Sequence, residues 1–207
     1  MTTSFNPNLS TDFAPILSQA AAANPAGQQR PPAKTVVAAL LEAEKTAKQQ
    51  RLRYPFSSLQ GTWRLCFTTG TRKAKRGGIA LGNGFYMPKL APAYITFAAA
   101  HPAAESQPEL GEITNQIQLA TVKLRLTGLC RYSSPKNLLA FDFNHMQIAA
   151  FNRPLYQGAF RGGKEQAEKF SQLSIAKLPF FAFFCVTEGY IAARGRGGGL
   201  ALWRRES

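Results

Sequence analysis

Residues 61–68 read Gly-Thr-Trp-Arg-Leu-Cys-Phe-Thr. In this stretch Trp63, Leu65 and Phe67 alternate with smaller or polar residues, and a period of two predicts a β-strand with one buried face. The large side chains should therefore point into the protein, and Arg64 should point out. This segment decides the fold class because much of the remaining chain repeats its pattern.

Alternating or apolar segments of strand length continue to the C-terminus. They lie at 93–99, 112–132, 139–150, 180–186, 190–194 and 200–204. Within 112–132 the apolar parity changes between Leu119 and Val122, which predicts a turn or bulge there. Residues 180–186 are apolar on both faces and should form a central strand. About eight or nine short antiparallel strands predict a mainly β domain, and a barrel of eight strands is just wide enough to hold one small ligand.

The N-terminal part of the chain has no strand pattern. Residues 1–33 carry five prolines and an alanine run, which predict a flexible tail with room for one short helix. From Lys34 the apolar residues fall at helical spacing, and this helix should end before Tyr54-Pro55, because a residue preceding proline is disfavoured in the α conformation. We therefore expect a flexible tail over 1–33 and, over 34–207, a helix followed by the barrel.

Catalytic motifs are missing from the sequence. The chain has two histidines, His101 and His145, and contains no HExxH, GxSxG or P-loop sequence. Its three cysteines are far apart, with no Cys-x-x-Cys pair, which argues against a zinc site or a disulfide framework. A pairing of Cys130 with His145 stays open at this point. We expect a protein that is not an enzyme and has no metal or cofactor.

The chain is strongly basic, with a formal net charge of +14. Such a charge attracts polyanions: nucleic acid, an anionic membrane surface or an acidic protein. From residue 51 to residue 76 there are seven positive charges and no acid. We predict that this basic stretch is a patch for lipid headgroups, with nucleic acid as the second choice and a solvated loop as the alternative. The residues of the predicted patch are Arg51, Arg53, Arg72, Lys73, Lys75 and Arg76.

Aromatic residues are abundant, with fifteen Phe, six Tyr and two Trp. Most of them must pack the core, but a few that line a cavity would form a pocket for an apolar, lipid-like molecule. The predicted ligand contacts inside the barrel are Trp63, Phe67, Phe97, Phe141, Phe143 and Phe184.

Two blocks of sequence resemble one known family. Residues 59–70, LQGTWRLCFTTG, are similar to the start of the plastid lipid-associated protein (PAP)/fibrillin domain, and residues 190–203, YIAARGRGGGLALW, are similar to its C-terminal block. The resemblance brackets residues 36–205 and implies a lipocalin-like barrel. It also implies that Gly61 and Trp63 close the base of the barrel and that Arg194 stacks on the tryptophan.

The same resemblance implies a function. Members of this family are associated with lipid, carotenoid or prenylquinone binding at thylakoid membranes. The expected location is the cyanobacterial cytoplasm or the plastid stroma, peripheral to thylakoids. The identity of the ligand and the oligomeric state are left open by the sequence.

Three other functions are compatible with the residues. The first is an RNA-binding module that uses the basic stretch and arginine-glycine turns such as Arg196-Gly197-Gly198, in which case basic residues should share a sheet face with exposed aromatic rings. The second is a lyase or chaperone for the chromophores of photosynthetic pigment proteins, which requires an open cavity with a polar rim. The third is a scaffold with a filled barrel that makes only protein contacts.

Overall fold

The computed structural model describes residues 13–22, 29–73, 79–99, 109–160, 170 and 173–206. Its helices are α1 (Phe13–Ala21) and α2 (Ala33–Gln50), with short 3-10 turns η1 (Phe56–Ser58), η2 (Ser134–Lys136) and η4 (Ile175–Lys177). The strands in these residues are β1 (Gly61–Thr68), β2 (Thr71–Lys73), β3 (Ile79–Leu81), β4 (Phe85–Tyr86), β5 (Ala93–Ala99), β6 (Glu109–Leu119), β7 (Val122–Ser133), β8 (Leu138–Ala150), β9 (Arg153–Ala159), β10 (Phe180–Val186), β11 (Tyr190–Gly195) and β12 (Leu200–Glu206).

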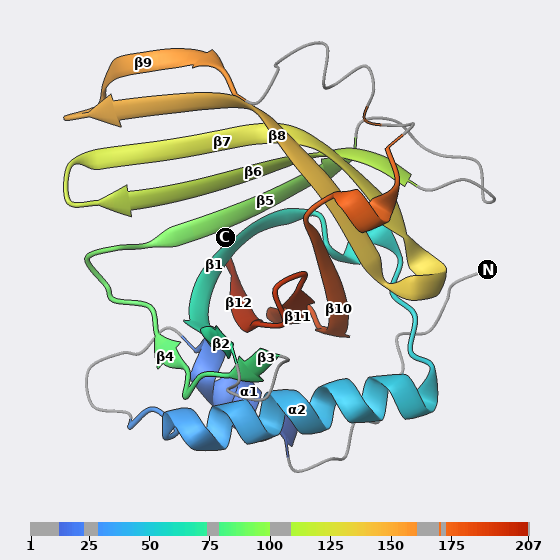
Figure 1. Cartoon of the computed structure of the whole chain (residues 1–207). Coiled ribbons are helices and arrows are strands. Elements are labelled where there is room, and N and C mark those ends of the chain that lie inside the picture. The colour runs from blue at the N-terminus through green and yellow to red at the C-terminus, as the bar shows by residue number, and fades with distance from the viewer. Residues whose placement is uncertain are drawn as a thin grey trace.

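Most of these strands belong to one antiparallel sheet that closes into a ring. The order around the ring is β10-β11-β12-β1-β5-β6-β7-β8, and β8 pairs back to β10 through residues 138–140 (Figure 1). β9 continues the sheet beyond β8, and β4 adds to β1, while β2 and β3 form a separate hairpin. The prediction of a mainly β, antiparallel and broadly barrel-like fold is confirmed. The turn predicted between Leu119 and Val122 is the β6–β7 turn.

The two largest of three hydrophobic clusters in the described residues hold the fold together. The ring core contains side chains from all eight ring strands and therefore fills the inside of the ring. Its buried members are Phe56, Leu59, Trp63, Ile95, Phe97, Ile113, Cys130, Tyr132, Leu139, Phe141, Phe183, Val186, Ile191, Ala193 and Trp203. The helix-side core lies on the outer face of β1 and β10–β12, against α1 and α2.

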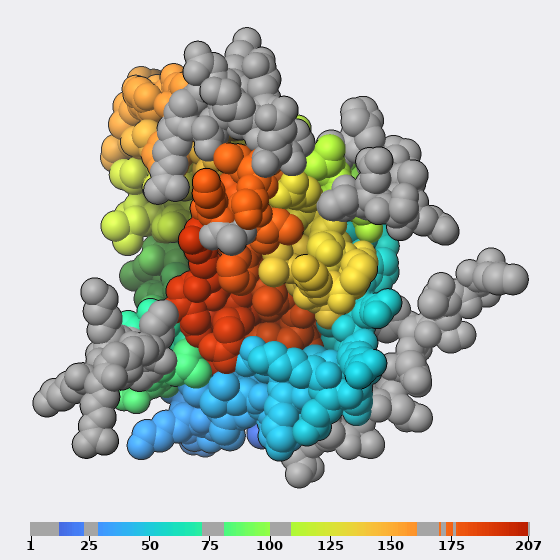
Figure 2. Space-filling model, turned by 45° about the vertical axis from the view of Figure 1, so that its right-hand side comes forward, coloured from blue at the N-terminus to red at the C-terminus, as the bar shows by residue number. Residues whose placement is uncertain are grey.

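The helices cover one outer face of the ring. α2 buries Val36 and Leu40 against the strands, and Figure 2 shows it packed along β10–β12. α1 lies within the segment predicted as a flexible tail, and its Phe13 and Leu17 are buried in the helix-side core. Apart from Ala22, the other residues of that segment before Gln29 lie outside the described part of the chain. Neither described helix is long and apolar enough to cross a membrane.

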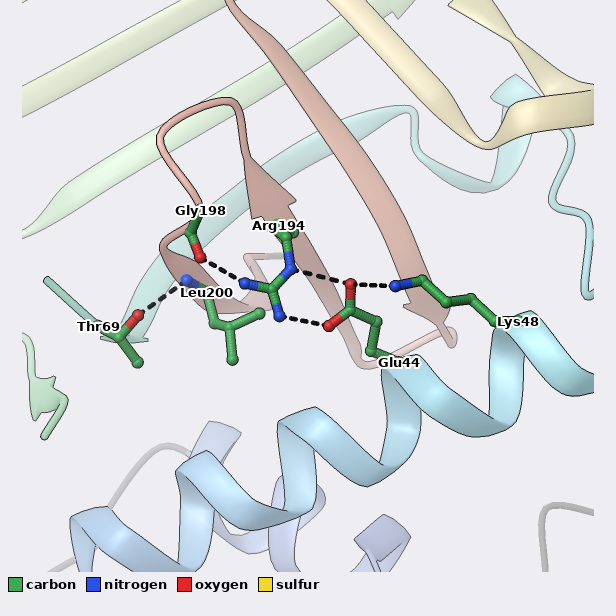
Figure 3. A network of polar contacts seen from close by, with 6 residues as sticks. All are labelled: Glu44, Lys48, Thr69, Arg194, Gly198 and Leu200. Atoms are coloured by element: carbon green, nitrogen blue, oxygen red, sulfur yellow. Dashed lines mark hydrogen bonds and ion pairs between the residues drawn. The ribbon is translucent and has the colours of Figure 1, made fainter. Parts of the chain in front are cut away.

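A partly buried ion pair attaches α2 to the ring (Figure 3). Glu44 of α2 accepts two hydrogen bonds from the guanidinium of Arg194 on β11, one of them from Nε at 2.9 Å. Lys48 adds a third contact at 3.0 Å, and Arg194 also donates to the carbonyl of Gly198. These hydrogen bonds, first of all those from Arg194, lower the pKa of Glu44 below its ordinary value of 4.5, although burial opposes them.

This lowered pKa predicts a pH dependence of stability. A carboxyl whose folded-state pKa is depressed contributes fully above its ordinary value, and the contribution is lost as the pH falls through the folded-state pKa. The difference in unfolding free energy between the wild type and Glu44→Gln should therefore be largest at neutral pH and shrink as the pH falls below 4.5. Urea unfolding at several pH values measures it. The exposed neighbour Glu42→Gln is the control, and an equally large pH dependence of its effect would contradict this assignment.

Candidate functional site

One end of the ring is closed by an aromatic plug. Trp63 is fully buried, and its indole N–H donates to the Leu59 carbonyl at 2.7 Å. Phe56 lies beside it in the same core and stacks on Tyr132 at 5.6 Å between ring centroids. The turn η1, just before β1, thus carries the side chains that fill this closed end.

Arg205 seals the closed end from outside. Its guanidinium lies 4.0 Å from the centre of the Trp63 ring, and it donates to the carbonyls of Glu188, Gln60 and Ser58. Gly61 leaves room for it, because a Cβ at this position would approach Nη1 of Arg205 to 2.8 Å, and the φ of Gly61 is +113°.

The arginine on Trp63 is thus Arg205, and not Arg194 as the resemblance implied. The reason is strand parity. Ala193 points into the ring core, so its neighbour Arg194 points out and pairs with Glu44. Arg205 stands directly opposite Trp63 in the β1–β12 register.

The interior of the ring is lined with aromatic side chains that meet across it. Phe97 of β5 contacts Phe183 of β10 at 6.0 Å, and Phe181 of β10 contacts Trp203 of β12 at 5.5 Å, although these strands are not neighbours. Edge-to-face pairs of this kind are favourable beyond the area they bury. The described rings therefore fill the inside of the ring and join strands that are not neighbours in the sheet.

The structure divides the six predicted interior residues between the two cores. Trp63, Phe97, Phe141 and Phe143 belong to the ring core or pack against it. The other two, Phe67 and Phe184, lie instead in the helix-side core. Phe184 comes directly after Phe183, which points into the ring, and therefore points to the other face. Phe67 follows an irregularity in β1, where the register shifts between Leu65 and Phe67. One extra residue in a strand turns the following side chains to the other face.

Among the described residues burial decreases along the ring axis, so these residues leave the other end partly uncovered. At the closed end Trp63 and Ile191 have no exposed surface. Toward the other end the lining side chains are only partly buried; they are Leu65, Phe143, Phe181 and Ala201. We call this second end the open end.

The apolar lining continues past the open end along β6–β8. Beyond Ala140, β8 no longer pairs with β10, and the sheet extends away from the ring (Figure 1, left). Side chains that pair across antiparallel strands lie on the same face. Ile113 and Phe143 face the inside of the ring. The register of β6, β7 and β8 beyond these two residues shows which side chains lie on the same side of the extension. This open face consists of Ile117, Leu119, Val122, Leu124, Leu126, Met146 and Ile148.

The reverse side of the extension is polar. The same register puts Gln116, Arg125 and Gln147 opposite one another on it. Among the apolar positions on the interior side stands one amide, Asn115, between Ile95 and Leu126. The extension is therefore an amphipathic sheet whose apolar side is continuous with the ring interior and carries one polar group near the open end.

The described residues of the predicted basic patch fall into two groups along the chain. Arg51 and Arg53 precede β1 and line a pocket of about 310 Å³ together with Lys48 and Lys136. Arg72 and Lys73 lie in β2, after β1, so the full length of that strand separates the two groups. Lys75 and Arg76 lie outside the described residues.

Cys130 and His145 do not meet. Cys130 is buried in the ring core, where burial raises its pKa to about 12, so the thiol is protonated at neutral pH. His145 pairs with Thr127 on the polar side of the extension. Among the described residues no three His, Cys, Asp or Glu side chains are grouped so that they could hold a metal ion.

Sequence reasoning missed Phe181, Trp203, Arg205 and the open face. Phe181 lies in a run of phenylalanines that shows no alternation of apolar and polar residues. Trp203 lies in the final predicted strand, whose sequence does not show which face is inside. A signal did exist for the open face: residues 117–126 alternate Ile, Leu, Leu and Leu with Gln, Lys and Arg. No protein-family model and no curated protein matches this chain.

Proposed function

We propose that this protein binds an apolar small molecule at the open end of the ring. The observation that carries the proposal is the exposure gradient, from fully buried Trp63 to partly exposed Phe143 and Phe181 and on to the open face. An apolar lining that stays in contact with water favours a ligand that covers it, at roughly 25 cal/mol per Å² of apolar surface removed from water.

The shape of the lining favours an elongated ligand. A short aromatic section inside the ring leads onto the flat aliphatic open face, which suits a chain longer than it is wide. Asn115 stands where a carbonyl or hydroxyl group of such a ligand would meet an amide. An acyl lipid, a carotenoid or a prenylquinone has this chemistry, in line with the resemblance to the PAP/fibrillin family and with a place beside thylakoid membranes.

The test is a matched pair of phenylalanine substitutions. Phe143 lines the open end, whereas Phe85 is 53% exposed on β4, outside the ring. Phe143→Ser should weaken binding of the fluorescent polyene parinaric acid by about tenfold, because a large apolar contact is lost. Phe85→Ser should change it by less than about twofold. Energy transfer from Trp203, which lies at the same end, reports binding.

The wild type should saturate at one probe molecule per chain. Equal affinities of the two variants, or no saturable binding to the wild type, would contradict the proposal. Circular dichroism of both variants verifies that each remains folded.

A further inference from the structure

Two hairpin turns lie side by side at the far end of the sheet extension. The β6–β7 turn holds Ala120 and Thr121, and the β8–β9 turn holds Phe151 and Asn152. The amide of Phe151 donates to the Thr121 carbonyl at 3.1 Å, and Nζ of Lys123 donates to the side-chain oxygen of Asn152 at 2.9 Å. These paired turns form one edge of the molecule (Figure 1, left).

Exposed apolar side chains gather at the paired turns. Leu119 is 66% exposed, Phe151 77% and Leu155 68%. Ile117, Val122 and Tyr156 add to them, so this region holds six of the ten large hydrophobic residues that are exposed in the described part of the chain. A concentration of this kind marks an interaction surface.

The backbone conformation of Phe151 is a second, independent indication that the paired turns contact something outside the chain. Phe151 and Asn152 have φ of +50° and +60°, the conformation of a two-residue turn that asparagine and glycine favour. A bulky residue is strained in this region, and 77% exposure means that burial in the fold does not offset the strain. Folding stability therefore does not explain an aromatic ring at this place, whereas contact with something outside the chain does.

The charges beside the paired turns have one sign. Lys123, Arg125 and Arg153 lie within a few residues of the turns, and the one acid between residues 113 and 160 is Asp142, which is buried. Aliphatic and aromatic side chains at a tip, with cations behind them, match the boundary between the acyl chains and the anionic headgroups of a bilayer. Nucleic acid fits less well, because it would leave Leu119 and Leu155 in water.

We propose that the paired turns dock onto an anionic lipid bilayer, with Phe151, Leu119 and Leu155 entering the acyl boundary. Lys123, Arg125 and Arg153 then contact the headgroups. This surface is distinct from the predicted basic stretch, and of its three inserted side chains only Leu119 also belongs to the open face.

The experiment is flotation of the full chain with vesicles of equal parts phosphatidylglycerol and phosphatidylcholine. Phe151→Asn should weaken vesicle binding by about tenfold, because it removes the largest inserted side chain. Its melting temperature should stay equal or rise, because asparagine suits the turn. Asn152→Gly is the matched control: it relaxes the same turn but keeps the ring, and it should float like the wild type.

Three further measurements decide the assignment. Arg153→Gln should weaken binding about fivefold, and vesicles of pure phosphatidylcholine should bind poorly. Phe143→Ser should float normally, which separates this surface from the ligand site. Unchanged flotation of Phe151→Asn would overturn the proposal. So would binding of a short RNA that competes with vesicles and depends on Arg153 but not on Phe151.

Discussion

Trp63→Ala is expected to lower the free energy of unfolding by about 3–5 kcal/mol, the usual cost of removing a large buried aromatic side chain. Trp63 is fully buried at the closed end. Its loss also leaves the Leu59 carbonyl without its donor and removes the ring over which Arg205 lies. Because a domain of this size has a total stability of about 5–15 kcal/mol, the variant should be close to unfolding at room temperature.

Urea unfolding followed by circular dichroism measures this change. Trp63→Phe is the control, because it keeps most of the buried ring and should lose far less stability. If it folds, Trp63→Phe should bind parinaric acid like the wild type, since the closed end lies away from the open end. An unchanged urea midpoint for Trp63→Ala would show that the closed end does not hold the ring together.

Arg194→Met is expected to cost about 2–4 kcal/mol, because it leaves a buried carboxylate without its main partner. The Glu44 side chain is 10% exposed, and its remaining partner, Lys48, is 75% exposed and can compensate little. The double variant Arg194→Met/Glu44→Leu should recover most of this loss, since it leaves no unpaired charge between α2 and β11.

The prediction is tested by comparing the stability of the single variants with that of the double variant. Thermal or urea unfolding of wild type, Arg194→Met, Glu44→Leu and the double variant gives a complete double-mutant cycle. If the double variant is no more stable than Arg194→Met, the ion pair does not set the attachment of α2. If Arg194→Met matches the wild type, Arg194 has no structural role at all.

The main features of the fold were predictable because they depend on local pattern. Alternation around Trp63 predicted β1, and the parity change between Leu119 and Val122 predicted the β6–β7 turn. The helical spacing after Lys34 predicted α2. In each case one face is apolar and the other polar, and the period is visible in a single segment.

Side-chain placement failed where both faces of a strand are buried. β1 and β10 pack the ring core on one side and the helices on the other, so Phe67 and Phe184 look like interior residues. The irregularity that turns Phe67 outward leaves no mark in the sequence of β1, and a run of phenylalanines does not show which of its members point inward. Arg194 was misplaced for a related reason, because its direction depends on a register that pairs β11 with β12 and β10.

The candidate site depends on three-dimensional information that the sequence lacks. The basic stretch looks continuous between residues 51 and 76, but among its described residues β1 runs between Arg53 and Arg72. The open face and the paired turns arise because β8 leaves β10 after residue 140 while it continues to pair with β7 and β9. The separation of β8 from β10 depends on how segments far apart in the sequence pair, and no local sequence pattern shows it.

The most direct test of the central claim is native mass spectrometry of the protein purified from the cells that make it, combined with solvent extraction. The account predicts one apolar molecule per chain, a lipid, carotenoid or prenylquinone, that is depleted in Phe143→Ser and retained in Phe85→Ser. The account would be contradicted if the wild type and both variants carried no apolar molecule, or if they carried nucleic acid in its place.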